Sequence, residues 1–149
     1  MGTNAGSPNV SFRFTGPQLL EQTFQDGAVL GPAELLAIRR QRLDLSEGRL
    51  LAILSYIPRS VQFDISATSV DHFRTEGASD PIIALAVVAD DDRMEVTSKV
   101  YFTFHQQGFP VRVFSEEAPA RSWLTEQINA FNRKADAGVV DRAHAGEVE

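Results

Sequence analysis

The chain has 149 residues, of which 43% are hydrophobic and 23% charged, and this composition suits one globular domain with its own core. Its net charge of −6 argues against nucleic-acid binding, because that affinity comes mainly from cationic side chains on phosphates. The sequence has no cysteine, which excludes disulfides, thiolate catalysis and sulfur-ligated metals and is consistent with a cytoplasmic protein. Its longest apolar run covers residues 82–89, far short of the roughly 20 residues that a membrane-spanning helix needs.

The first third of the chain predicts a hairpin followed by a helix. Residues 1–9 are small and polar, and we expect them to be disordered. Apolar and polar residues alternate over Val10–Phe14, which indicates a half-buried strand, and a Gly-Pro break separates it from a second strand at Leu19–Phe24. An antiparallel hairpin can join the two. A brief extended piece at residues 28–30 leads to Pro32, which suits a first helical position, and the helix runs on to Leu43.

This helix carries most of the one basic cluster in the sequence. Arg39, Arg40 and Arg42 lie on it and Arg49 follows shortly after. On a helix these arginines alternate with leucines, and this pattern predicts that they form its solvated face.

Two strongly apolar segments follow. Arg49–Ile57 and Ile82–Ala89 are too uniformly apolar for a sheet face open to water, so both faces of the sheet must be covered there. Between them, Asp64 or Ser66 can cap a further helix that continues to Phe73.

The last part of the chain alternates helix and strand. Asp91 or Asp92 can cap a helix over residues 93–104, and Val111–Phe114 predicts the final strand. A closing helix after Ser115 has a stripe of apolar residues at helical spacing, namely Ala120, Leu124, Ile128 and Phe131. We expect residues 132–149, which lack an apolar period, to be a flexible tail.

These elements together predict a single α/β domain over residues 10–131. It has a mixed sheet of about five strands, with an N-terminal antiparallel hairpin followed by parallel crossovers, and about four helices cover the sheet.

One part of the chain resembles a known family. The segment Arg93-Met94…Tyr101-Phe102…Phe109–Glu117…Ser122-Trp123-Leu124 is similar to the C-terminal half of small bacterial STAS-like (SpoIIAA-like) domains. Residues 27–34 and Leu50–Ile57 fit the same layout more loosely, so that the resemblance covers about residues 18–131. These motifs concern packing and imply the fold more than the function.

The resemblance implies two kinds of function. STAS domains are non-enzymatic regulators that bind partner proteins and are switched by phosphorylation of a serine in a turn after the central strand. Divergent relatives are similar in fold to CRAL-TRIO lipid-transfer domains, which hold apolar ligands. The corresponding turn here is residues 63–68, with Ile65 where the phosphorylated residue would stand. Ser66 is therefore the candidate switch residue, and the alternative is that Asp64 or Ser66 only caps a helix.

The sequence offers no signature of catalysis. Asp90, Asp91 and Asp92 at a strand end could hold Mg²⁺, or could serve as helix cap and favourable charge. His72, His105 and His144 are far apart and in no metal-ligand spacing. Nucleophile elbow, phosphate loop and dinucleotide fingerprint are all missing. We therefore expect no enzyme, no catalytic residue, no metal and no cofactor, with an Mg²⁺-dependent enzyme as the least favoured alternative.

Aromatic and apolar residues concentrate around the helix at 93–104. The candidates for a ligand pocket or an interface are Tyr56, Phe73, Met94, Tyr101, Phe102, Phe104 and Phe109. The leading hypothesis is a regulatory, protein-binding domain that forms a homodimer through residues 93–109. The alternative is a carrier or sensor of a small apolar, lipid-like molecule.

Overall fold

The computed structural model describes residues 5–7, 9–75 and 78–148, and it describes side chains for residues 9–74 and 80–137. In this part of the chain one six-stranded sheet has the order β1-β2-β3-β5-β9-β10. Its strands are β1 (Ala5–Ser7), β2 (Val10–Gly16), β3 (Leu19–Phe24), β5 (Leu51–Ile57), β9 (Ile82–Ala89) and β10 (Val111–Phe114). The remaining elements are β4 (Val29–Leu30), α1 (Pro32–Ser46), β6 (Gln62–Phe63), the 3-10 turn η1 (Ile65–Ser69), β7 (Arg74–Thr75), β8 (Ala78–Ser79), α2 (Asp92–Phe104) and α3 (Glu117–Val148).

The sheet is mixed in the way that the sequence predicts. β1, β2 and β3 pair antiparallel, whereas β3, β5, β9 and β10 pair parallel. Every side chain of β9 is buried, as are all but one of those of β5. The predicted α/β fold class and its five strands are confirmed, and the short β1 adds a sixth strand at the edge.

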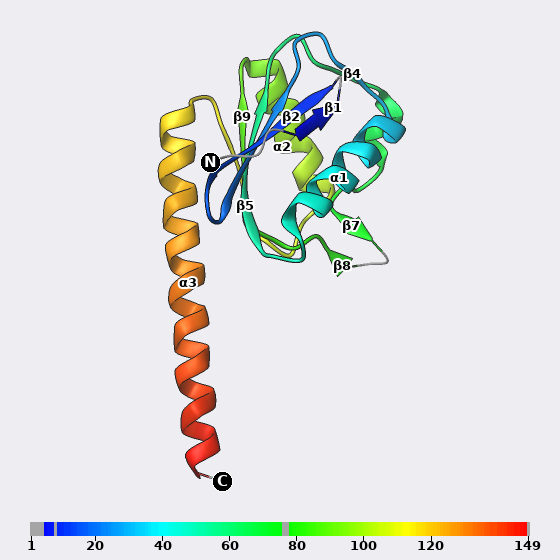
Figure 1. Cartoon of the computed structure of the whole chain (residues 1–149). Helices are drawn as coiled ribbons and strands as arrows, with labels where there is room; N and C mark the ends of the chain where they lie inside the picture. The colour runs from blue at the N-terminus through cyan, green and yellow to red at the C-terminus, as the bar shows by residue number, and fades with distance from the viewer. Residues whose placement is uncertain (1–4, 8, 76–77, 149) are drawn as a thin grey trace.

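Helices cover both faces of this sheet (Figure 1). α3 packs on one face, where Ala120 and Leu124 join a core with Leu54, Ala86 and Phe114. α1 and α2 lie over the other face, and Ile38 and Met94 belong to the larger core there. The predicted cap of α2 is confirmed, because the Asp91 carboxylate accepts a hydrogen bond from the Met94 N–H at 2.9 Å.

The helix expected between Asp64 and Phe73 does not form, and this prediction was wrong. Only the single 3-10 turn η1 forms, so that three α-helices stand in the described residues where about four helices were expected. The side chains of Thr68 and Ser69 hydrogen-bond to carbonyls three residues earlier, and the Asp71 carboxylate accepts the Phe73 N–H at 2.9 Å. Such local side-chain bonds compete with helical ones, and the chain turns into extended backbone at Val70.

The two ends of the chain also differ from expectation. Residues 5–7 pair with β2, and α3 continues through residues 132–148, where a flexible tail was expected (Figure 1). Residues 1–4, 8 and 149 lie outside the described residues. The domain boundaries at residues 10 and 131 stay predictions.

The packing of α3 on the sheet yields a stability prediction. Leu124 is fully buried between α3 and the sheet, so Leu124→Ala removes apolar contacts and leaves a cavity. We expect the free energy of unfolding in urea to fall by about 2–5 kcal/mol. The matched control is exposed Glu126→Ala on the same helix, which should change it by less than about 0.5 kcal/mol. A Leu124→Ala loss as small as the control's would contradict this packing.

Candidate functional site

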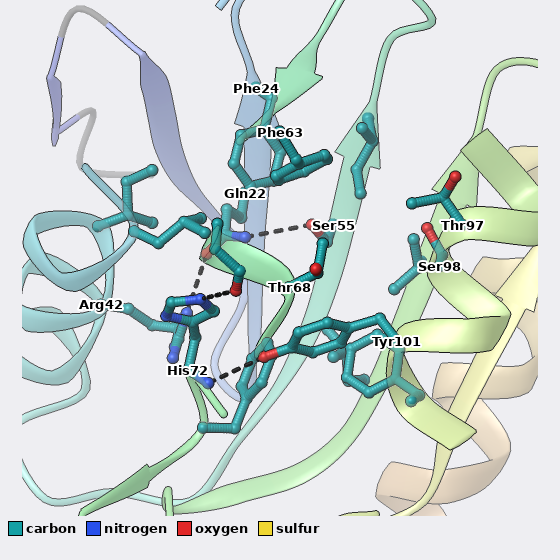
Figure 2. A pocket seen from close by; sticks show the side chains of 18 residues that line it. Gln22, Phe24, Arg42, Ser55, Phe63, Thr68, His72, Thr97, Ser98 and Tyr101 are labelled. Atoms are coloured by element: carbon teal, nitrogen blue, oxygen red, sulfur yellow. Dashed lines mark hydrogen bonds between the residues drawn. The ribbon is translucent and has the colours of Figure 1, made fainter. Parts of the chain in front are cut away.

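A cavity of about 100 Å³ lies between the sheet and the helices on the α1–α2 side (Figure 2). β3, β5 and β9 form its floor, α1 and α2 form two walls, and the segment from Phe63 to Phe73 covers it. Most of its lining is apolar, including Phe24, Ile57 and Phe102. Thr68 is exposed and Thr97 is half-buried, so the cavity reaches solvent between η1 and α2.

The floor combines one polar row with apolar neighbours. Gln22 on β3 stands opposite Ser55 on β5, and Ser55 stands opposite Val87 on β9. Because alternate residues of a strand face the same way, this register brings all three side chains to the cavity. The Gln22 amide donates to Ser55 Oγ at 3.2 Å, and both residues are buried.

α1 adds a buried arginine to this row. Arg42 lies one turn after Ile38 on the inward face of α1 and is only 4% exposed. Its Nη1 donates to Gln22 Oε1 at 3.3 Å, and its guanidinium lies over the Phe73 ring, 4.9 Å from the ring centroid. A chain of hydrogen bonds thus runs from Arg42 through Gln22 to Ser55 (Figure 2).

Asp80, which precedes β9, holds Arg42 and its neighbour Arg39. Arg42 Nη2 lies 2.9 Å from Asp80 Oδ2, and Arg39 forms a two-pronged ion pair with the same carboxylate. Burial lowers the pKa of Arg42, an effect that Asp80 opposes, and the hydrogen bond to Asp80 raises the pKa of Arg39. Both guanidinium groups stay charged at neutral pH. The Arg42 Nε has no hydrogen-bond partner among the described residues.

The burial of Arg42 and the ion pair of Arg39 correct the prediction of a solvated basic face for these two residues, whereas Arg40 and Arg49 are exposed as predicted. The leucine spacing alone did not distinguish the two sides of this helix. The partners that make burial of Arg42 tolerable, Gln22 and Asp80, are far away in the sequence.

The side chain of Tyr101 on α2 hydrogen-bonds to the segment from Phe63 to Phe73, which we call the cover of the cavity. The Tyr101 hydroxyl accepts the His72 backbone N–H at 2.9 Å (Figure 2). The same hydroxyl donates to the Val70 carbonyl at 2.7 Å. His105 Nε2 donates to the Thr68 carbonyl at 2.9 Å, and His72 Nε2 donates to the Ala67 carbonyl at 2.7 Å. Burial lowers the pKa of His72, which keeps the imidazole neutral at pH 7.

The candidate residues from the sequence fall into three groups. Phe73, Tyr101 and Phe102 line the cavity. Phe109 and Met94 are buried in the core on the same face of the sheet.

The other candidates lie elsewhere. Tyr56 packs on the opposite face of the sheet, with the α3 core, and Phe104 is 80% exposed. Ser66 is exposed on η1, and its phosphorylation stays a prediction.

The structure brings no metal-binding cluster together in its described residues. Asp91 is engaged as the cap of α2, while Asp90 and Asp92 are exposed beside it. The His144 side chain lies outside the described side chains. None of the helices in the described ranges combines the length and apolarity needed to cross a bilayer.

Sequence reasoning missed Gln22, Arg42, Ser55 and Asp80. A signal was present for two of them, because Gln22 and Ser55 are polar residues at positions that strand alternation assigns to the core. A polar side chain at such a position needs a buried partner or a ligand.

Comparison with known proteins gives two similarities. The sequence family described as domain of unknown function DUF7793 matches residues 17–128. A solved structure, that of an uncharacterized DUF3478-family protein with a SpoIIAA-like fold from Shewanella loihica PV-4, is similar with 11% identity and a TM-score of 0.48. The match covers 83% of this chain and 92% of that one. No curated protein matches the chain.

The buried hydroxyl of Tyr101 yields a pH prediction. Burial raises its pKa from 10.0 to about 12. An unfolded chain loses this proton near pH 10, so between about pH 10 and 12 the folded state holds more protons and the free energy of unfolding falls as the pH rises. We expect the absorbance of phenolate, taken as wild type minus Tyr101→Phe, to titrate near pH 12.

The control for this titration is Tyr56→Phe, which should keep the late-titrating phenol. A difference titration centred at pH 10 would instead show that Tyr101 is open to water.

Proposed function

We propose that this chain, which belongs to the DUF7793 family, is a non-catalytic domain that holds one small, mainly apolar molecule in its cavity, as a carrier or sensor. The observation that carries the proposal is the cavity itself. Native interiors are close-packed, so a largely apolar space of this size behind a mouth is unusual without an occupant.

The cavity volume sets the size of the occupant. At about 100 Å³ the cavity is smaller than an engineered one of roughly 150 Å³ that binds benzene. A branched group of roughly four or five carbons therefore suits it. A long acyl chain would need the cover from Phe63 to Phe73 to move.

The polar groups around the mouth support a binding role over catalysis. His72 Nε2 and the Tyr101 hydroxyl, which could act in proton transfer, each hydrogen-bond to backbone carbonyls of the cover. Their hydrogen bonds fix the cover in place, which is what a domain that retains a molecule requires.

Filling the mouth should abolish ligand binding. Thr97→Phe enlarges a half-buried side chain at the cavity, and the probe is 3-methyl-1-butanol, a neutral branched alcohol. Wild type should bind it and gain melting temperature, because a ligand of the folded state stabilises it. Thr97→Phe should show neither effect in calorimetry and thermal melting.

Thr103→Phe is the matched control, because Thr97 and Thr103 both lie on α2 and both hydrogen-bond to the carbonyl four residues earlier. Thr103 is exposed and should tolerate the change with binding intact. The proposed function would be contradicted if wild type bound neither this alcohol nor the amide and acid with the same branched chain, and its native mass spectrum showed no co-purified molecule.

A second candidate function is protein interaction through self-association. Its supporting observation is an exposed apolar stripe on α2, formed by Val96, Val100 and Phe104 at 60%, 49% and 80% exposure. The spacing of four residues places all three on one side of the helix. A second copy could cover this stripe, in keeping with the regulatory role that the STAS-like resemblance implies.

Sedimentation tests this candidate. We expect wild type to pass from monomer to dimer with rising concentration, and Phe104→Glu to stay monomeric with an unchanged melting temperature. Thr103→Glu, at an exposed neighbouring position, should still dimerise. A wild type that sediments as a monomer up to high concentration would rule out the self-association.

A further inference from the structure

The α1 wall of the cavity holds one buried cation, Arg42. Arg39 and Arg42 share one carboxylate, Asp80, whose two oxygens accept all of their ionic hydrogen bonds. The Arg39 and Arg42 side chains are 11% and 5% exposed and that of Asp80 is 2% exposed. Arg39 is only partly buried and does not line the cavity, whereas Arg42 lines it and keeps an Nε donor without a partner among the described residues. A buried donor without a partner is costly away from water.

The nearby Asp71 carboxylate is engaged by other groups. Asp71 is ion-paired with Arg74 and also accepts hydrogen bonds from the Gln107 amide. Among the described residues, Asp80 is the carboxylate that pairs with Arg42.

The hydrogen bonds on the cavity floor have a defined direction. A guanidinium can only donate, so Gln22 Oε1 must accept from Arg42, and this fixes the orientation of the Gln22 amide. The amide nitrogen of Gln22 then donates to Ser55 Oγ. The single hydroxyl proton of Ser55 is left to donate to something else, and no acceptor for it is found among the described residues.

The hydroxyl of Ser98 also lacks a hydrogen-bond acceptor among the described residues. Ser98, on the α2 wall, is buried at 7% exposure and lines the cavity, and its hydroxyl has no hydrogen bond within the described part of the chain. Ser55 and Ser98 come from different walls of one mainly apolar cavity (Figure 2). Two hydroxyl protons that face one cavity without a protein acceptor in the described ranges can both donate to a bound group that accepts hydrogen bonds.

We infer that the molecule held in this cavity is a small carboxylate, with its charged head against Ser55 and the Arg42–Gln22 row and its branched apolar body among the phenylalanines. This inference rests on the proposed function and specifies its ligand. The carboxylate carries the charge opposite to that of Arg42 and accepts from the free donors, which are the Arg42 Nε and the serine hydroxyls. A neutral apolar molecule would do neither.

Three probes of similar shape separate the contributions of the apolar body, a neutral polar head and a negative charge to the affinity. 3-Methyl-1-butanol joins the apolar body to a neutral hydroxyl, isovaleramide replaces this hydroxyl by an amide, and isovalerate replaces it by a negatively charged carboxylate. In calorimetry at neutral pH and constant ionic strength, wild type should bind isovalerate about ten-fold or more tightly than isovaleramide, as expected for hydrogen bonds to a charged group.

Ser55→Ala tests where the head lies. It should weaken the binding of isovalerate about ten-fold and that of the alcohol less, because hydrogen bonds to a charged acceptor are stronger. Exposed Ser122→Ala should change neither affinity. Ser98→Ala is the substitute if Ser55→Ala fails to fold.

The outcomes separate this inference from the proposed function. Equal affinity for isovalerate and isovaleramide, with the alcohol still bound, would overturn the carboxylate head and leave the apolar site standing. Isovalerate binding that Ser55→Ala leaves unchanged would overturn the assigned position of the head. Failure of all three probes to bind would overturn both.

Discussion

The fold depends on the burial of β5 and β9 on both faces. Eight consecutive buried side chains in β9 leave no face of the central sheet for water, so helices must cover both sides. The two covers are unequal. α3 lies along one face with a continuous stripe of apolar residues, whereas α1 and α2 share the other face with the cover from Phe63 to Phe73. A cavity remains where these pieces meet.

Arg42 gives this cavity its chemistry. An arginine on the inward side of α1 is tolerated because Asp80, just before β9, and Gln22, on β3, receive its donors. These contacts also join three elements that are far apart in the sequence. A leucine there would bury the same face without any partner, so the ionic arrangement is not required for packing and is better explained by recognition.

The sequence predicted those parts of the fold that depend on local pattern. The apolar run of β9, the alternation of β2 and the stripe of α3 each determine an element without reference to the rest of the chain. The turn at η1 was missed because Thr68, Ser69 and Asp71 form side-chain hydrogen bonds that compete with a helix.

The site was less predictable than the fold for a related reason. Phe73, Tyr101 and Phe102 stood out as aromatics, but nothing local distinguished them from Tyr56, which faces the other core. Arg42 and Asp80 are 38 positions apart, and only the packing of α1 against β9 brings them together.

α2 carries both of the proposed roles on different sides. Ser98, Tyr101 and Phe102 face the cavity, whereas the stripe of Val96, Val100 and Phe104 faces outward. A ligand changes self-association only if it binds monomer and dimer with different affinity. Such a difference in affinity would require the ligand to change the position of α2, which the proposed ligand contacts at Ser98. The hydrogen bonds of Tyr101 and His105 hold this helix to the cover. They therefore limit how far α2, and with it the exposed stripe, can move when a molecule occupies the cavity.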